Sequence, residues 1–195
     1  WSTVEKLAPL GPAFASVTYG AGGTTRERTL KVVQTLKNDG RMEPAAHLTC
    51  IGADKAGIND IAKDWLERGI TRLVALRGDP PQNTGLYKPH PNGYANAADL
   101  VSGLRRIGDF DISVAAYPET HPDSHSEAAD IANLKAKIDN GASRAITQYF
   151  FDVDMFLRFR DKLAKAGIDA PLVPGIMPIS HFGRMVNFSK RCGTF

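Results

Sequence analysis

Residues 58–79 read INDIAKDWLERGITRLVALRGD, and this stretch contains one complete unit of a repeated pattern. Apolar residues at helical spacing over 58–68 are followed by Gly69, which suits the left-handed position that closes a helix. The apolar run 73–76 predicts a buried strand, and the chain then turns polar at Arg77-Gly78-Asp79. The unit is therefore a helix, a closing glycine, a strand and a polar strand end.

The same order recurs along the whole chain. Helices are predicted over 25–39, 58–68, 95–107, 127–140 and 153–166. The glycines expected to close helices are Gly11, Gly40, Gly69, Gly108, Gly141 and Gly167. Strands are predicted at 14–19, 45–50, 73–76, 112–116, 145–147 and 172–173. Strands that alternate with helices at this spacing form βαβ units and predict a parallel sheet.

Two parallel α/β folds compete for this pattern. An open doubly wound sheet usually carries G-x-G-x-x-G after its first strand, and the glycine-rich turn at residues 20–23 does not fit that motif. A complete (β/α)8 TIM barrel needs about 250 residues. Because the chain holds only about six units and opens within a helix, we favour an incomplete barrel with about strands 2 to 7 of 8. We expect residues 1–195 to form a single domain.

Composition excludes several classes of protein. The 195 residues are 43% hydrophobic, which is enough for a sizeable core, and no apolar run is long enough to span a membrane. The 24 basic and 21 acidic residues are interspersed and give a net charge of only +3, which argues against nucleic acid as a partner. Cys50 and Cys192 are too few and too far apart for a disulfide framework, so we expect a cytoplasmic protein.

Polar side chains gather where the predicted strands end. In chain order these are Thr18 and Tyr19, then His47 and Thr49, then Arg77 and Asp79, then Tyr117, Glu119 and His121, then Gln148. In TIM barrels the active site is built at the carboxyl ends of the strands. The sequence therefore predicts one pocket, and Gly78 would let a flat ligand approach the backbone closely.

Each of these residues also has a structural interpretation. His47 alone is better explained as a core histidine, and Asp79 before a proline can be a turn residue. Asp130, Asn133 and Lys137 share one helical face, which by itself indicates a solvated surface. His121 and His125 have a spacing found in metal sites, but they flank a turn and lack further ligands, so we predict no metal.

At the strand ends the chain resembles the bacterial type of methylenetetrahydrofolate reductase. The resemblance covers essentially the whole chain, because six motifs follow one another in the family's order. They are Ser16-Val17-Thr18-Tyr19-Gly20-Ala21, His47-Leu48-Thr49-Cys50, Ala75-Leu76-Arg77-Gly78-Asp79, Ala115-Ala116-Tyr117-Pro118-Glu119, the run 145–152 from Ala145 to Asp152, and Pro174-Gly175-Ile176-Met177-Pro178.

The resemblance implies a flavin enzyme on a (β/α)8 barrel. In this family a reduced nicotinamide, NADH or NADPH, passes hydride to FAD and leaves. Methylenetetrahydrofolate then takes its place and is reduced to methyltetrahydrofolate, which gives ping-pong kinetics and feeds methionine synthesis. The chemistry belongs to the flavin, and the protein supplies position and electrostatics. Family members are commonly homo-oligomers.

The matching positions imply the residues of the site. The predicted FAD contacts are Thr18, His47, Arg77, Gly78, Asp79, Tyr94, Ala95, Tyr117, His121, Asp130, Asn133 and Lys137. The predicted folate contacts are Gln148, Asp79 and Thr18. Asp79 is expected to act electrostatically in catalysis, because a carboxylate beside the flavin and the pterin favours a cationic folate intermediate.

The family's general acid is a glutamate at the end of the first barrel strand, which would precede Trp1. We therefore expect the chain to lack its proton donor, and a non-catalytic flavin-binding fragment or degenerate barrel is the alternative hypothesis. A barrel aldolase that forms a Schiff base is a weaker one, because no lysine lies on a predicted strand.

Overall fold

A computed structural model describes residues 1–19, 23–79 and 87–194 of the chain. Its internal contacts divide the chain into two compact units, Trp1–Ile112 and Ser113–Phe195. Each unit is described by itself below, and the expectation of a single domain stays a prediction.

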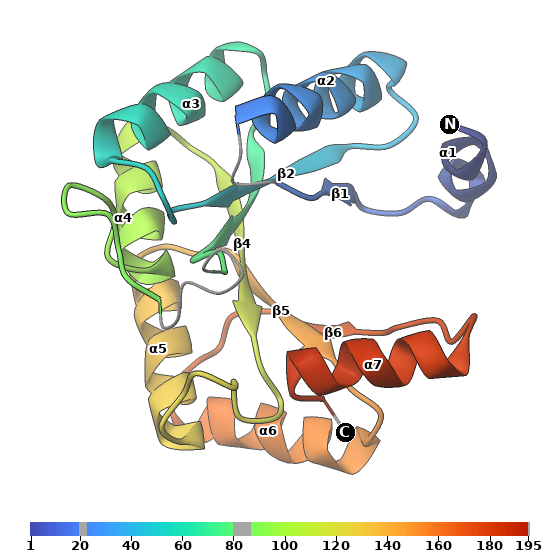
Figure 1. Ribbon diagram of the computed structural model, residues 1–195, viewed down its shortest axis with the longest axis vertical. Coiled ribbons are helices and arrows are strands. Elements are labelled where there is room, and N and C mark those ends of the chain that lie inside the picture. Colours follow the sequence, from blue (N-terminus) through green and yellow to red (C-terminus); the bar gives the residue numbers. More distant parts are fainter. Residues whose placement is uncertain (20–22, 80–86, 195) are drawn as a thin grey trace. The chain divides into compact units, whose positions relative to one another are not determined.

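The first unit alternates strands and helices (Figure 1). After α1 (Ser2–Leu7) and a short 3-10 helix (Ala8–Leu10), its elements are β1 (Ala15–Val17), α2 (Gly23–Asp39), β2 (Pro44–Thr49), α3 (Lys55–Glu67), β3 (Arg72–Leu76) and α4 (Ala97–Ile107). Helix α2 packs on β2, and α4 packs on β3 and on α3. These helices cover strands whose apolar residues face both sides of the sheet.

The second unit continues the alternation. Its elements are β4 (Asp111–Ala116), α5 (Glu127–Asp139), β5 (Arg144–Tyr149), α6 (Val153–Lys165), β6 (Leu172–Gly175) and α7 (Phe182–Cys192). The first two residues of β4 belong to the first unit, where the Asp111 N–H donates to the Thr71 carbonyl over 2.8 Å.

The strands are parallel wherever their register is defined, and their order in the sheet is their order in the chain. Ala15 pairs with Pro44 at the start of β1 and β2, and Thr49 pairs with Leu76 at the end of β2 and β3. Sequential parallel strands that alternate with helices are the topology of a (β/α)8 barrel with strands missing. The predicted fold class, an incomplete TIM barrel, is confirmed.

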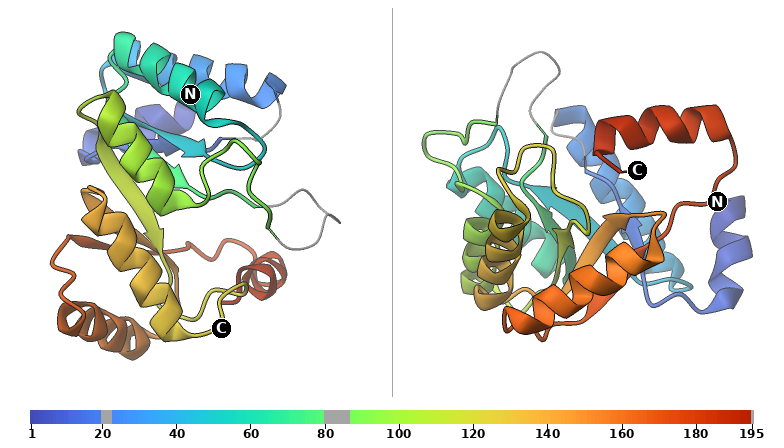
Figure 2. Two further views of the ribbon diagram at one scale, coloured as in Figure 1. Left: turned by 90° about the vertical axis from the view of Figure 1, so that its left-hand side faces the viewer. Right: turned by 90° about the horizontal axis from the view of Figure 1, so that it is seen from below.

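The core of the first unit is built from both sides of its strands. Ala45, Leu48, Leu73 and Ala75 are fully buried, together with Trp65 from α3. Figure 2 shows α2 and α3 on the same side of β1 and β2. Burial of this kind stabilises the fold in proportion to the apolar area removed from water.

Helix α7 is a feature that the glycine pattern did not predict. It is held against β5 by Tyr149, whose hydroxyl lies 3.0 Å from Ser189 Oγ and whose ring stacks on Phe188 at a centroid distance of 6.0 Å. Two of its large apolar side chains, Phe182 and Phe188, remain exposed.

The glycine pattern is right at five positions and wrong at one. Gly11, Gly40, Gly69, Gly141 and Gly167 have positive φ angles at or just after a helix end. Gly108 is the exception, because its φ of −179° is extended backbone that any residue adopts. A Cβ there would overlap only the methyl group at the end of the flexible Leu66 side chain, so neither the backbone nor a rigid neighbour requires glycine at this position.

The start of α5 is set by Ser126 and not by Ser124. Ser124 and Glu127 have the spacing of a capping box, but the N-cap of α5 is Ser126, whose Oγ accepts from the Ala129 N–H over 3.2 Å. Ser124 Oγ donates to the Ser126 carbonyl instead.

Some sequence predictions fall outside the described residues. They are the glycine-rich turn at 20–22 and the part of the β3–α4 loop at 80–86. In the described part of the chain, no helix has both the length and the hydropathy that crossing a bilayer requires.

We predict that Gly103→Ala destabilises the protein by about 1–3 kcal/mol, the usual cost of overpacking a core. A Cβ at Gly103 would overlap the ring and hydroxyl of Tyr94, which is only 1% exposed. Gly183→Ala in α7 is the matched control, because a Cβ there would meet nothing closer than 3.6 Å. Thermal unfolding of both variants measures the difference, and equal melting temperatures would contradict the packing argument.

Candidate functional site

The carboxyl ends of β2 and β3 bring predicted site residues together in the first unit. Along β2, His47 and Thr49 are partly exposed, whereas Ala46, Leu48 and Cys50 are fully buried. His47 and Thr49 therefore share one face of the strand, as their spacing predicts. Burial lowers the pKa of the His47 imidazole, which favours its neutral form.

Gly78 lies where backbone and side chains approach most closely. The β2–β3 ladder continues past the strands, because the Ile51 N–H donates to the Arg77 carbonyl over 3.1 Å. Gly78 then takes a φ of +85°, and a Cβ there would lie 2.5 Å from Ile51 Cγ2 and 3.0 Å from Thr49 Cβ. Position 78 therefore requires glycine for two reasons, the left-handed backbone and the lack of space.

Thr18 and Asp79 extend this edge with exposed side chains. The Thr18 carbonyl accepts from Thr29 Oγ1 of α2 over 2.9 Å, which fixes the backbone where β1 ends. Thr49 Oγ1 is buried and has no hydrogen-bond partner within the described residues. A buried orphaned hydroxyl beside a glycine cradle fits a ligand that brings a polar group close to the backbone.

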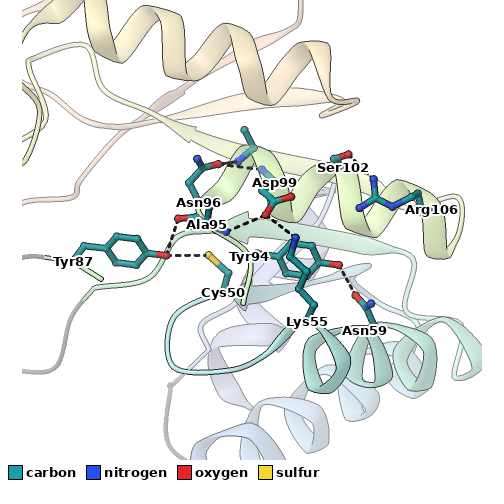
Figure 3. Close-up of polar contacts among 11 residues, drawn as sticks. Cys50, Lys55, Asn59, Tyr87, Tyr94, Ala95, Asn96, Asp99, Ser102 and Arg106 are labelled. Atoms are coloured by element: carbon teal, nitrogen blue, oxygen red, sulfur yellow. Dashed lines mark hydrogen bonds and ion pairs between the residues drawn. The ribbon is translucent and has the colours of Figure 1, made fainter. Parts of the chain in front are cut away.

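Tyr87 is a residue of this edge that sequence reasoning missed. The guanidinium of Arg77 lies over the Tyr87 ring, 4.7 Å from the centroid. Figure 3 shows the Tyr87 hydroxyl, which donates to the Ala95 carbonyl over 3.1 Å. Cys50 Sγ lies 3.7 Å from the same hydroxyl. No sequence motif marks a tyrosine in a loop as the partner of an arginine ten residues earlier, so the pairing is visible only in three dimensions.

Tyr94 and Ala95, both predicted to contact the cofactor, have different environments. The Tyr94 side chain is buried under α4 and its hydroxyl donates to Asn59 Oδ1 over 2.5 Å, which leaves only its backbone for a ligand. Ala95 is exposed, and its N–H donates to Asp99 Oδ2 over 3.0 Å. Asp99 also pairs with Lys55 at 3.1 Å (Figure 3).

This ion pair sets the charge state of Asp99. Partial burial opposes its ionisation, but the Ala95 N–H and the Lys55 ammonium hold the pKa of the Asp99 carboxyl below its usual range. The ionised carboxylate is the stronger acceptor and fixes the peptide before α4.

In the second unit the β4–α5 loop brings Tyr117, His121 and Asp130 together. The rings of Tyr117 and His121 meet edge to face at 4.5 Å, and the His121 N–H donates to Asp130 Oδ2 over 2.8 Å. His121 Nδ1 accepts from the Asp123 N–H over 3.0 Å, which places the ring proton of the neutral tautomer on Nε2.

The α5 face is not the uniformly solvated surface that its sequence alone indicates. Asn133 is exposed and Asp130 is half-buried, but Lys137 is only 8% exposed and its Nζ donates to the Ala115 carbonyl over 2.8 Å. The helix therefore places a buried cation beside β4. Amphipathic side chains of this kind bury their stems while the ammonium keeps polar partners.

Gln148 lies near the end of β5, next to Tyr149, which pairs with Gly175 of β6. Its Oε1 accepts from the Tyr149 N–H over 3.1 Å, and its amide nitrogen is the group that can donate elsewhere. Next to it, the Gly175 N–H donates to Thr147 Oγ1 over 2.8 Å, and a Cβ at Gly175 would collide with the Thr147 carbonyl.

The structure thus assembles two sets of predicted residues, one in each unit. In the first unit they are Thr18, His47, Arg77, Gly78, Asp79, Tyr94 and Ala95, and in the second Tyr117, His121, Asp130, Asn133, Lys137 and Gln148. Three or more His, Cys, Asp or Glu side chains do not cluster as metal ligands anywhere in the described residues. Both sets offer donors and a cation, and the second set also offers the aromatic ring of Tyr117, which suits an anionic ligand with a flat ring.

Comparisons with solved structures bear on the fold. A 2,3-dimethylmalate lyase of the PEP mutase/isocitrate lyase superfamily superposes with a TM-score of 0.63 over 97% of this chain and 74% of the lyase, at 12% identity. An oxaloacetate acetylhydrolase superposes with a TM-score of 0.60 over 98% of this chain and 69% of that protein, at 16% identity. At such low identity these likenesses support the fold alone.

Comparisons with curated proteins bear on the family. The chain is 52% identical to the 5,10-methylenetetrahydrofolate reductase of Pectobacterium carotovorum over 97% of this chain and 61% of that protein. It is 48% identical to that of Escherichia coli over 97% of this chain and 62% of that protein. It is 40% identical to methylenetetrahydrofolate reductase (NADH) 1 of Arabidopsis thaliana over 96% of this chain and 34% of that protein.

The chain therefore spans less than two thirds of the length of these relatives. The family model for methylenetetrahydrofolate reductase matches residues 1–194, which is nearly the whole chain. The family predicted from the strand-end motifs is confirmed, and the chain belongs to the methylenetetrahydrofolate reductase family.

Proposed function

We propose that the protein to which this chain belongs reduces methylenetetrahydrofolate to methyltetrahydrofolate, with FAD as its cofactor and NADH or NADPH as its electron donor. The observation that carries the proposal is the family match over residues 1–194, within which the predicted contact residues occupy strand ends and the loops and helix that follow them. The proposal includes a homo-oligomeric assembly, as the resemblance implies, and a cytoplasmic location, as the two widely separated cysteines indicate.

The first unit offers suitable partners for FAD. The Gly78 cradle and the orphaned Thr49 hydroxyl fit a cofactor that lies against the backbone. Arg77 supplies a planar cation, and the neutral His47 imidazole supplies a donor. Asp79 and Thr18 add exposed polar groups at the same edge. FAD, when bound, would supply the hydride chemistry.

The second unit offers the complementary partners. Tyr117 presents an aromatic face beside His121, whose Nε2–H is a donor. Lys137 is a buried point charge that suits a pyrophosphate, and Asp130 holds the loop that carries His121. Gln148 has a donor to offer to a pterin edge, because its Oε1 is held by the Tyr149 N–H.

Asp79 is proposed to act on the folate and not on the nicotinamide. An exposed carboxylate beside a reacting pterin stabilises positive charge that develops during opening of the methylene bridge. No such charge develops on a folate while the nicotinamide occupies the site, so the two half-reactions should respond differently to loss of this carboxylate.

The central experiment uses the full-length protein. We expect the purified protein to show the visible absorbance of an oxidised flavin, and NADH to bleach it. Methylenetetrahydrofolate should then restore the oxidised spectrum. A protein that binds flavin but is not reoxidised by the folate would support the non-catalytic alternative, and a protein without flavin would refute the proposal.

We predict that Asp79→Asn slows the folate half-reaction by about tenfold or more, because a charge that stabilises the transition state is lost. The nicotinamide half-reaction should change by less than about threefold. Stopped-flow absorbance measures both steps separately. Asp60→Asn, at an exposed aspartate of α3, is the control. Equal slowing of both half-reactions would contradict the role given to Asp79.

His47 should also make the apoprotein sensitive to acid. Its pKa is lowered in the fold, so below pH about 6.5 the unfolded chain binds a proton that the folded chain excludes. Stability should therefore fall as the pH decreases from about 6.5 toward the folded pKa, and His47→Gln should flatten this decline. Urea unfolding between about pH 7.5 and 5 measures the slope, with His125→Gln as the exposed control. An unchanged slope in His47→Gln would show that the histidine is not the cause.

A further inference from the structure

Tyr87 joins two segments of the first unit that are distant in sequence. The guanidinium of Arg77, from the end of β3, lies over the Tyr87 ring. The Tyr87 hydroxyl donates to the Ala95 carbonyl just before α4, as Figure 3 shows. Cys50 at the end of β2 lies within 3.7 Å of the same hydroxyl. The Tyr87 side chain thus contacts residues that directly follow β2 and β3 and a residue that lies just before α4.

The backbone at both ends of this bridge is already fixed. The Arg77 carbonyl accepts from the Ile51 N–H at 3.1 Å and from Cys50 Sγ at 3.4 Å. The peptide of Ala95 is held from both sides, because its N–H donates to Asp99 and its carbonyl accepts from Tyr87. The Arg77 side chain has a second contact, because its Nε donates to the Gly78 carbonyl over 3.4 Å. Tyr87 adds the contact with the face of the guanidinium, and its hydroxyl adds a hydrogen bond to the Ala95 carbonyl.

Tyr87 and Arg77 both keep the protonation state that these contacts require at neutral pH. Burial raises the pKa of the Tyr87 phenol, with the nearby Cys50 as a further cause, so the hydroxyl stays protonated and remains a donor. Arginine keeps its charge at every physiological pH, so the guanidinium is always attracted by the face of the ring.

We propose that Tyr87 is a positioning residue for the cofactor, because it orients the Arg77 guanidinium and the Ala95 backbone that the proposed function places against FAD. The inference rests on that proposed function and adds to it a residue outside the family motifs quoted above. Since Tyr87 acts through two groups, its effect has two parts, one from the ring and one from the hydroxyl.

The test measures FAD affinity of the full-length apoprotein by quenching of flavin fluorescence. Tyr87→Phe removes only the hydroxyl, and we expect FAD to bind about threefold more weakly, as for loss of one ordinary hydrogen bond. Tyr87→Leu also removes the ring, and we expect about tenfold weaker binding from the combined loss.

The chain offers a matched control. Arg72 lies over the ring of Phe14 with the guanidinium carbon 5.2 Å from the centroid, in the same unit but at the amino end of β3. Phe14→Leu removes a cation–aromatic contact of the same kind away from the strand ends, and we expect FAD affinity to stay within twofold of the wild type. Thermal unfolding of both apoprotein variants shows whether they lose similar stability.

A double-mutant cycle separates positioning from general loss of structure. In an Arg77→Met background, Tyr87→Leu should weaken FAD binding only about threefold further, because the ring no longer has a cation to orient. The effect of Tyr87→Phe should be the same in both backgrounds. The absorbance envelope of bound FAD should shift in Tyr87→Leu and not in Phe14→Leu.

The outcomes distinguish the inference from the function on which it rests. Wild-type protein that binds no FAD would overturn both. If the wild type binds FAD and Tyr87→Leu binds it as tightly as Phe14→Leu does, the positioning role alone is overturned. Full additivity between Tyr87→Leu and Arg77→Met would likewise overturn it, because the two side chains would then act independently.

Discussion

Parallel pairing of the strands is the constraint on which the rest of the structure depends. A parallel strand cannot be reached by a tight turn, so each one is followed by a crossover of a dozen or more residues, here a helix. All strands in a parallel set then end at the same edge, and the residues that follow them are neighbours. The β2–β3 register shows the result, because Thr49 pairs with Leu76 and the next residues place Gly78 against Thr49.

The strand ends alone do not fix the loops that follow them. Residues in the first turn of the next helix hold these loops in place. In the first unit Asp99, in the first turn of α4, accepts the N–H of Ala95. In the second unit Asp130, in the first turn of α5, accepts the N–H of His121. Each aspartate lies near a helix N-terminus, where negative charge is favourable, and reaches back to fix the loop that carries predicted contact residues. The same device thus occurs in both units.

The sequence predicts the alternation and the strand ends because both depend on local patterns. Apolar runs, closing glycines and the polar residues after each run are visible without knowledge of the fold. Contacts between segments that are distant in sequence are not visible in this way, and the features that depend on such contacts were not predicted. Tyr94 is a core residue because Gly103 makes room for its ring, and α7 is held by Tyr149. The bridge made by Tyr87 belongs to the same class.

The fold alone does not determine the reaction that a protein of this topology catalyses. A lyase and a hydrolase share this topology at 12% and 16% identity, so the topology is compatible with unrelated chemistry. What differs among such proteins must lie in the side chains at the carboxyl edge and in the groups that hold them. Arg77-Gly78-Asp79 illustrates why a motif alone is an incomplete description. Gly78 is fixed by its backbone conformation and its packing, whereas the Arg77 guanidinium also contacts a tyrosine ten residues away that lies outside the motif. Two chains with the same motif can therefore differ in how firmly they fix the same arginine.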